Sequence, residues 1–325
     1  MTSRHFEEGK TGENTKSDEA ITSKKVWVSL VTNLDYLPGF LTLEHSLRSV
    51  NSAYPLVALY TDALPPAGHA ALRSRGIPTL RGDHLVPSVP KSYEQDPRFH
   101  ETWSKLSAFS LTQFDRIVQL DSDMLVRRNM DELMELALDP PGEEGAGDRV
   151  FAASYACVCN PLGKPHYPSD WIRENCAFTS QHDAPDRAQT EGAPLGAGLA
   201  MPNSGLLVIN PSRAAYELIL KELVEATSTA AYEFGDQSLI GYTFRGRWAP
   251  LPYVYNALKT LRWKGVHDQI WRDERVKNVH YIMVPKPWDE PDGERGQADE
   301  THKWWWDAND ERKRLEKTRG IEDEF

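Results

Sequence analysis

The chain has 325 residues, 40% of them apolar, and a formal net charge of −11 at pH 7. This length and composition predict a folded protein that buries one large core or two modest ones. The acidic balance argues against a general nucleic-acid or membrane-surface binder, because both partners are polyanions that favour clustered Lys and Arg.

Residues 1–23 are mostly polar, and ordering them would bury too little apolar surface to offset the lost conformational entropy. We therefore expect a disordered N-terminal leader. It lacks the apolar segment of a secretory signal, and no run in the chain approaches the roughly 20 apolar residues that span a bilayer. The expectations are a cytoplasmic location and no transmembrane segment.

The apolar pattern that follows alternates between strands and helices. Strands are predicted at 25–33 and 55–62, and helices at 38–51 and 65–76. This alternation is typical of a parallel sheet with helices on its faces. Residues 103–114 carry several large apolar side chains and predict one more helix.

The next predicted strand, Ile117–Leu120, runs directly into Asp121-Ser122-Asp123. In open α/β sheets ligands bind outside the carboxyl ends of the strands, and an extended segment points Asp121 and Asp123 to the same side. Two carboxylates so placed repel unless a cation joins them, and a hard divalent ion leaves positions for phosphate oxygens. The alternative is a turn that caps a helix starting near Asn129.

Three later stretches also place polar residues beside apolar elements. They are Asn203-Ser204-Gly205 before a buried strand, Gly235-Asp236-Gln237 at a helix start, and a strand led by His280 and followed by Lys286-Pro287-Trp288. Each has an ordinary explanation: a turn, a helix N-cap and a buried core histidine. The four motifs in this order are far more specific than any one of them.

Together the four motifs resemble the glycogenin-like family of retaining glycosyltransferases, family 8, which includes glycogenin and galactinol synthase. The resemblance runs from about Val26 to Trp288. It implies the GT-A fold, an α/β, Rossmann-like fold with a mixed, mostly parallel central sheet flanked by helices. A single GT-A domain over 24–289 follows. The implied activity is metal-dependent transfer of a hexose from a UDP-sugar, UDP-glucose or UDP-galactose, with retention of configuration.

The resemblance also implies roles for individual residues. The uracil and ribose would be held by Thr32, Asn33 and Tyr36, and Lys105 would lie near the acidic motif and the sugar phosphate. A Mn²⁺ or Mg²⁺ ion would be bound by Asp121, Asp123 and His280, with Ser122 between the carboxylates on the nucleotide side. Lys286 would grip the phosphate of the leaving UDP. The transferred sugar and its reacting face would be surrounded by Asn203, Ser204, Asp236 and Gln237.

These residue types suit the chemistry, since a metal and Lys286 would stabilise the charge that builds on departing UDP more in the transition state than in the substrate. Retention through a covalent intermediate would need a carboxylate nucleophile, and Asp236 is the nearest candidate. The usual family expectation is instead a front-face mechanism, in which the departing phosphate accepts the acceptor's proton. We expect Asp236 to orient the sugar and stabilise the oxocarbenium ion.

Some positions depart from the family pattern. Glu233 stands where glycogenin has Asp, which leaves the donor hexose open, and Met283 replaces a frequent Gly, so a backbone contact to phosphate is expected to differ. Glycogenin glucosylates its own tyrosine, but residues 257–279 contain none. We expect a non-self acceptor: a polyol, a glycan, a lipid headgroup or a secondary metabolite.

A long insertion is expected at about 139–200, and it resembles the Cys-containing insert of plant galactinol synthases. Cys157, Cys159 and Cys176, with His166 or His182, suit a structural Zn²⁺ site, although unpaired cysteines are often small buried hydrophobes. Loops at the carboxyl ends of strands line substrate clefts, so the insertion is expected to contribute to acceptor choice.

Residues 290–325 predict an acidic linker followed by a charged helical tail. The Trp304-Trp305-Trp306 run would pack this helix back on the domain, and a patch for a protein partner is the alternative. The sequence leaves open whether the chain forms a homodimer.

Two other functions fit parts of the pattern. A phosphatase of the haloacid-dehalogenase type also places Asp-x-Asp after an apolar strand, with the first Asp as nucleophile. That class expects the motif near the start of the domain, whereas here it follows about a hundred residues. A non-catalytic UDP-sugar-binding subunit is the other alternative.

Overall fold

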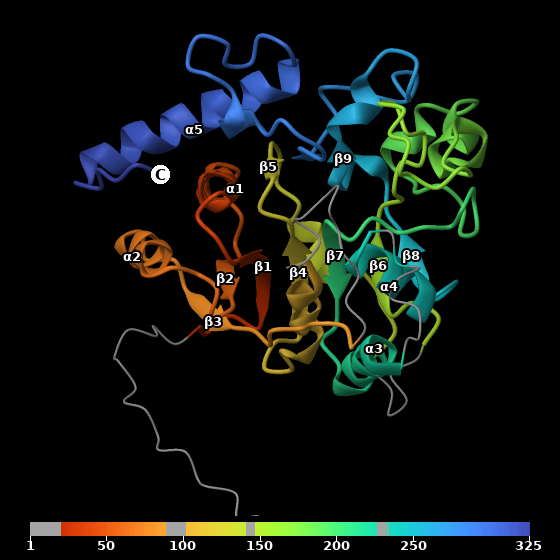
Figure 1. Cartoon of the computed structure of the whole chain (residues 1–325), viewed down its shortest axis with the longest axis horizontal. Helices are drawn as coiled ribbons and strands as arrows, with labels where there is room; N and C mark the ends of the chain where they lie inside the picture. The colour runs from red at the N-terminus through yellow and green to blue at the C-terminus, as the bar shows by residue number, and fades with distance from the viewer. Residues whose placement is uncertain (1–20, 89–101, 141–146, 226–231, 233) are drawn as a thin grey trace, which may run out of the picture.

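The computed structural model describes residues 21–88, 102–140, 147–225, 232 and 234–325; the expected leader, 1–23, lies almost entirely outside these ranges. The molecule is built on a seven-stranded sheet in the order β3-β2-β1-β4-β7-β6-β8 (Figure 1). Its strands are β1 (Lys25–Val31), β2 (Leu56–Tyr60), β3 (Thr79–Arg81), β4 (Arg116–Leu120), β6 (Phe151–Ala153), β7 (Leu206–Ile209) and β8 (Trp248–Pro250).

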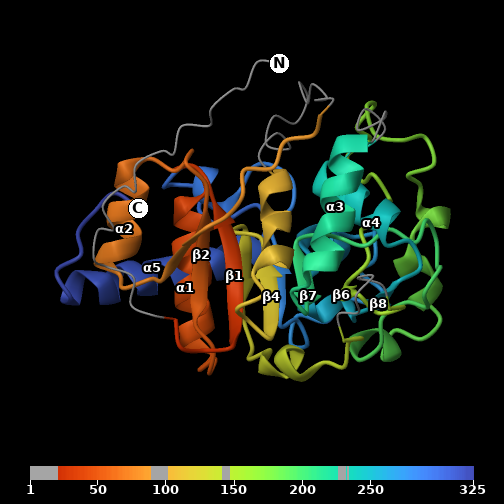
Figure 2. The same cartoon turned by 90° about the horizontal axis from the view of Figure 1, so that it is seen from below.

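The central strands are mostly apolar because both faces of the sheet are covered. Alternate residues of β1 enter two different cores: Val26 and Val28 pack on one side, and Trp27 and Val31 on the other. Figure 2 shows α3 and α4 beside β7, β6 and β8, and α1 and α2 beside β1 and β2. For this reason the central strands stand out in the sequence as mostly apolar runs.

The sheet is mixed and mostly parallel, as predicted. β3, β2, β1 and β4 are parallel neighbours, β7 is antiparallel to both β4 and β6, and β6 and β8 are parallel. A second, three-stranded sheet has the order β5-β10-β9. Its strands are β5 (Met124–Val126), β9 (Ala257–Leu258) and β10 (Asn278–His280). Because β5 follows the Asp121-Ser122-Asp123 motif directly, its pairing with β10 brings His280 beside that motif.

The helices are α1 (Leu37–Ser49), α2 (Pro66–Ser74), α3 (Arg213–Glu225), α4 (Asp236–Thr243) and α5 (Glu300–Thr318). The helices predicted at 38–51 and 65–76 are α1 and α2. The one predicted at 103–114 is instead a shorter 3₁₀ helix, Thr102–Ser110. The hydroxyls of Ser107 and Ser110 bond to carbonyls three residues earlier, a local pairing that competes with α-helical bonds.

The segment predicted to be an insertion, about 139–200, contains one strand of the central sheet. Phe151–Ala153 is β6, a strand of the central sheet that pairs with both β7 and β8. Three apolar residues are too few to reveal a strand by their pattern. Beyond Ala153 the segment carries short 3₁₀ helices at Arg173–Asn175, Ala177–Gln181 and Arg187–Gln189.

The C-terminal helix α5 lies beside α1 (Figure 1). The ring of Trp305 is fully buried 5.4 Å from that of Trp288, and the guanidinium of Arg127 lies 3.5 Å above the ring of Trp304. The tryptophan run therefore packs the tail on the domain, as expected. Within the described ranges, none of the helices has the length and apolar character needed to cross a membrane.

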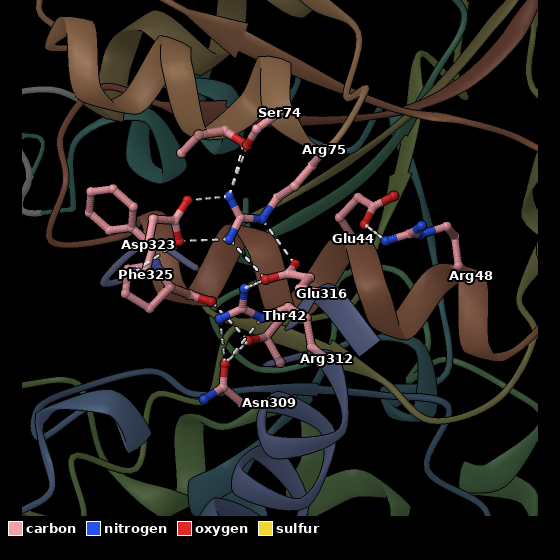
Figure 3. Close-up of polar contacts among 12 residues, drawn as sticks. Thr42, Glu44, Arg48, Ser74, Arg75, Asn309, Arg312, Glu316, Asp323 and Phe325 are labelled. Atoms are coloured by element: carbon pink, nitrogen blue, oxygen red, sulfur yellow. Dashed lines mark hydrogen bonds and ion pairs between the residues drawn. The ribbon is translucent and has the colours of Figure 1, made fainter. Parts of the chain in front are cut away.

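A buried ion-pair network fixes the end of α5 to the end of α2 (Figure 3). The guanidinium of Arg75 donates two hydrogen bonds to Glu316, at 2.9 and 2.8 Å, and two more to Asp323, at 2.7 and 2.8 Å. Glu316 also accepts from Arg312 at 2.7 Å. Burial alone would raise the pKa of Glu316, but Arg75 and Arg312 overcome it and hold the pKa below its ordinary value.

A group whose pKa is lowered by folding stabilises the fold above its unfolded pKa and loses that contribution as the pH falls. We expect the free energy of unfolding to drop as the pH falls from about 4.5, the ordinary pKa of a glutamate. Glu316→Gln should cost about 3 kcal/mol at pH 7, because it breaks a buried pair, and should flatten this acid slope. Urea titrations at pH 7 and pH 3.5 measure both effects. Glu322→Gln, at an exposed glutamate of the same tail, is the control; equal slopes in the two variants would contradict the assignment.

Candidate active site

The polar motifs meet in a cavity of about 490 Å³ at the carboxyl ends of β1 and β4. Every residue predicted for the nucleotide, the sugar and the Mn²⁺ or Mg²⁺ ion except Lys286 lines it: Thr32, Asn33, Tyr36, Lys105, Asp121, Ser122, Asp123, Asn203, Ser204, Asp236, Gln237 and His280. The main chain joins two of the motifs, since the amide of Asp121 donates to the carbonyl of Gly205 at 2.8 Å. Glu233 lies outside the described residues.

Asp121, Asp123 and His280 form a set of ligands suited to a divalent cation. One ligand atom of each lies within 4.8 Å of the other two, and Nε2 of His280 is 3.2 Å from Oδ1 of Asp123 and 3.8 Å from Oδ2 of Asp121. Two carboxylates and an imidazole are suitable donors for Mn²⁺, and two carboxylates also suit Mg²⁺. The residues present therefore fit the ion that the family resemblance implies.

A chain of buried amides sets the orientation of the His280 ring. Asn256 donates through Nδ2 to Oδ1 of Asn203 at 2.8 Å, so its own Oδ1 faces Nδ1 of His280 at 2.9 Å and accepts from it. The neutral ring then carries its lone pair on Nε2, the nitrogen that faces the carboxylates. Asn203 donates in turn to Oε1 of Gln237 at 3.0 Å, which links the metal ligand to the sugar side of the cavity.

Gly205 is required by this arrangement. A Cβ at this position would lie 2.3 Å from Cε1 and 2.7 Å from Nδ1 of His280, closer than real side chains approach. The Asn203-Ser204-Gly205 motif therefore serves two purposes: the asparagine joins the amide chain, and the glycine leaves room for the imidazole ring.

Two buried lysines balance the acidic groups. Lys286 pairs with Asp123 and donates to the carbonyl of Tyr281 at 2.7 Å, so its side chain is turned toward the cavity wall that holds the metal ligands. Lys105 lies 3.0 Å from Asp121 and 2.9 Å from Asp236. Burial opposes ionisation of Asp123, but Lys286 and His280 hold its pKa well below the usual range.

Asp236 begins α4 and is almost completely buried beside Lys105. Burial raises the pKa of this carboxyl, while Lys105 and a hydrogen bond from Ser204 oppose the rise. With Asp121 and Asp123 it makes three carboxylates against two ammonium groups. These groups together carry a net negative charge. A divalent cation would make the net charge positive, which suits a diphosphate.

The end of the cavity that the family resemblance assigns to the nucleotide follows β1. The side chain of Asn33 accepts from the amide of Tyr36 at 3.1 Å, which fixes the turn that presents both residues to the cavity. The Tyr36 ring stands edge-on to Trp288, with centroids 5.8 Å apart, and the ammonium of Lys286 lies 5.7 Å from the Tyr36 centroid. The turn after β1 and the loop that carries Lys286 therefore form one wall.

The Lys286 loop is supported from behind by residues that the sequence did not single out. Lys259 donates to the carbonyl of Pro285 at 3.0 Å and lies 3.0 Å from Nε2 of His302, a residue of α5. Burial, reinforced by the nearby charge of Lys286, lowers the pKa of Lys259 to about 8. Met283 has a φ of 66°, so the backbone keeps the left-handed conformation for which glycine is favoured although a side chain is present.

Asn256 is the clearest functional residue missed by sequence reasoning, and its role leads to a prediction. Asn256→Ala should raise the Mn²⁺ concentration needed for half-maximal activation by about 10- to 100-fold, with kcat at saturating Mn²⁺ changed only a few fold. Metal-activation curves measure this. Asn256→Asp keeps an oxygen that accepts from His280, so its Mn²⁺ concentration for half-maximal activation should stay near that of the wild type. An equal rise of this concentration in both variants would assign the effect to the contact with Asn203 instead.

Known proteins are similar to this chain in sequence and in fold. The family model described as Glycosyl transferase family 8 matches residues 27–292. Galactinol synthase 1 of Ajuga reptans is 28% identical over 300 residues, covering 90% of this chain and 83% of its own length. Galactinol synthase 1 of Arabidopsis thaliana is also 28% identical, over 288 residues, covering 87% of this chain and 77% of the relative.

Solved structures share the fold. The glycosyltransferase GlyE of Streptococcus pneumoniae TIGR4 superposes with a TM-score of 0.56 at 19% identity, covering 88% of this chain and only 60% of that chain. The galactosyltransferase LgtC, solved with donor and acceptor sugar analogs, gives a TM-score of 0.53 at 16% identity and covers 88% of this chain and 96% of its own. These likenesses show the predicted GT-A fold. Since the family model covers most of the chain, the protein belongs to glycosyl transferase family 8, a family of retaining glycosyltransferases.

Proposed function

We propose that the protein transfers a hexose from a UDP-sugar to a hydroxyl of a small non-self acceptor, in a reaction that depends on a divalent cation. The observation that carries the proposal is the convergence of Asp121, Asp123 and His280 in one cavity with Lys105, while Lys286 pairs with Asp123. Two carboxylates, an imidazole and two ammonium groups are the groups that a metal-bound diphosphate requires.

In this proposal, the residues on the Lys286 side of the cavity stabilise the leaving group, UDP. When bound by Asp121, Asp123 and His280, Mn²⁺ or Mg²⁺ would supply Lewis-acid stabilisation of the charge that develops on UDP. Lys286 adds a fixed positive charge in a buried site, where it acts more strongly than in water. Thr32, Asn33 and Tyr36 would hold the uracil and ribose, with Ser122 at the nucleotide side of the carboxylates.

The sugar lies, in this proposal, between the Asn203–Gln237 pair and Asp236. The amides of Asn203 and Gln237 offer hydrogen bonds that orient the ring, together with Ser204. The Asp236 carboxylate stabilises the positive charge of an oxocarbenium ion. In a front-face mechanism the departing phosphate takes the acceptor's proton, so retention needs no covalent bond to Asp236.

The relatives favour galactose as the hexose and a cyclic polyol as the acceptor, because several of them are named for making galactinol, a galactoside of such a polyol. Part of the cavity lining is aromatic. Trp171 stacks on Phe234 with centroids 4.2 Å apart, and Tyr167 meets Phe234 edge-on at 5.2 Å. Aromatic faces of this kind suit the apolar face of a polyol or sugar ring.

The test is release of UDP by the purified chain from UDP-galactose, UDP-glucose and UDP-N-acetylglucosamine, with Mn²⁺, with Mg²⁺ and with a chelator. Each donor is then paired with a panel of polyols, glycan ends, glycosylated lipids and small phenolic acceptors, and the linkage of the product is determined by NMR. We expect metal-dependent turnover of a UDP-hexose, increased by one acceptor class, with the anomeric configuration retained.

Other outcomes separate the alternatives. UDP binding without turnover of any donor would indicate a non-catalytic subunit. Failure to bind UDP or any donor would contradict the assignment of Asp121, Asp123 and His280. The phosphatase alternative is set aside by membership of family 8.

A further inference from the structure

A second cluster of metal-ligand side chains lies apart from the Asp121, Asp123 and His280 site. Cys157, Cys159, Cys176 and His267 each place one ligand atom within 4.8 Å of the other three. Nε2 of His267 is 3.1 Å from Sγ of Cys159 and 3.2 Å from Sγ of Cys176. The three cysteines are free thiols, so no disulfide accounts for their approach.

The cluster joins two segments that are distant in sequence. The cysteines belong to the segment that follows β6, whereas His267 lies between β9 and β10, more than ninety residues after Cys176. His267 is fully buried and Cys176 is 2% exposed, while Cys157 and Cys159 are partly buried. Neither histidine expected from the sequence supplies a ligand: His166 is exposed, and His182 contacts His267 instead.

We propose that Cys157, Cys159, Cys176 and His267 bind one structural Zn²⁺ ion. Tetrahedral zinc with bonds of about 2.0 to 2.3 Å holds its ligand atoms roughly 3.3–3.8 Å apart, so small side-chain adjustments complete the site. Three thiolates and one imidazole are a known type of structural zinc set. Four protein ligands leave no open position for a substrate, which distinguishes this site from a catalytic one.

The second ring nitrogen of His267 also has a partner. Nδ1 of His267 lies 2.8 Å from Nε2 of His182, as expected for a metal-ligating histidine whose other nitrogen is held by a neighbour. If Nε2 of His267 binds zinc, the proton of this ring is on Nδ1. Nδ1 of His267 then donates the hydrogen bond, and Nε2 of His182 accepts it. Arg173 donates to Nδ1 of His182 at a long 3.4 Å, so zinc binding requires this weak bond to be given up as His182 takes the other tautomer.

Zinc binding at this site should also affect the part of the cavity that binds the acceptor. This step rests on the proposed function. Cys157 itself lines the cavity, and the loop between Cys159 and Cys176 carries Tyr167 and Trp171. Closing that loop on His267 would hold both rings against Phe234. Zinc loss is therefore expected to raise the KM for the acceptor several fold, while metal-dependent binding of UDP stays unchanged.

The test measures metal without any substrate. The full chain is purified without a metal-chelating tag, and Zn, Mn and Fe are determined by plasma mass spectrometry. We expect about one zinc per chain in the wild type, and less than one-tenth of that in Cys176→Ser and His267→Ala. His166→Ala is the matched control and should keep its zinc. Asp123→Asn should keep it as well, which separates this site from the one that binds the nucleotide.

A second measurement covers the case in which the ligand variants do not fold. Wild-type protein is stripped with a chelator under reducing conditions and titrated with Co²⁺, whose spectrum reports tetrahedral thiolate ligation, and the Co²⁺ is then displaced by Zn²⁺. Absence of zinc together with absence of the cobalt–thiolate spectrum would overturn the proposal. Zinc that persists in Cys176→Ser but disappears in Asp123→Asn would also overturn it. Neither result bears on whether UDP-sugars are turned over.

Discussion

Asp123→Asn should lower kcat/KM for the UDP-sugar by about a thousandfold or more, the largest effect expected of any substitution in this chain. Asp123 is buried, contacts His280 at 3.2 Å and pairs with Lys286, so it is the more enclosed of the two carboxylates in the Asp121-Ser122-Asp123 motif. The amide has the same shape but no charge, and it is a weaker ligand for a hard cation. A thousandfold loss corresponds to about 4 kcal/mol of transition-state stabilisation.

The same variant should no longer be stabilised by Mn²⁺. Binding at a hundred times the dissociation constant adds about 2.7 kcal/mol to the stability of the wild type, which raises its Tm. Thermal unfolding with and without Mn²⁺ and UDP measures this. Asp115→Asn, at an exposed aspartate just before β4, is the control. Wild-type activity or an unchanged Mn²⁺ response in Asp123→Asn would refute the metal assignment.

Lys286→Met should lower kcat by about 100- to 1,000-fold and change the KM for the donor much less. The methionine keeps the length and apolar stem of the side chain but removes the ammonium. The loss should fall on kcat because the charge on UDP develops mainly in the transition state. Steady-state kinetics at saturating Mn²⁺ separates the two parameters.

Lys286→Met should also affect stability in a metal-dependent way. Without the ammonium, the buried Asp123 keeps only its contact with His280, and we expect a loss of about 3 kcal/mol in the metal-free chain. Mn²⁺ should restore much of it, because the cation takes over the pairing. Lys264→Met, at an exposed lysine, is the control. A loss confined to KM would mean that Lys286 contributes only ground-state binding.

The strongest sequence signals belonged to elements whose pattern is local. The apolar runs of β1, β2, β4 and β7 are buried on both faces, so their composition is uniform and easily recognised. Polar residues at the ends of such strands could be assigned to a ligand site because parallel strands end at a common edge. This reasoning assigned Asp121 and Asp123 to a ligand site. Asn203, which precedes the antiparallel strand β7, and Asp236, which begins α4, were assigned to it through the family resemblance.

Other features depend on contacts between distant segments and have no local signal. β6 is three residues long and becomes a strand only because β7 and β8 lie on either side. Asn256 looked like part of an ordinary loop until its hydrogen bonds to Asn203 and His280 were visible. His267 is the fourth member of the cysteine cluster, but nearer histidines competed for that role in the sequence.

The docking of α5 has a consequence for what counts as the catalytic unit. The family match ends at residue 292, yet His302 of α5 touches the lysine that holds Pro285, next to Lys286, and Trp305 packs on Trp288 of the same loop. Residues beyond the matched range therefore help to shape the loop that carries Lys286. Changes in α5 offer a route to alter the position of this loop without altering any residue that lines the cavity.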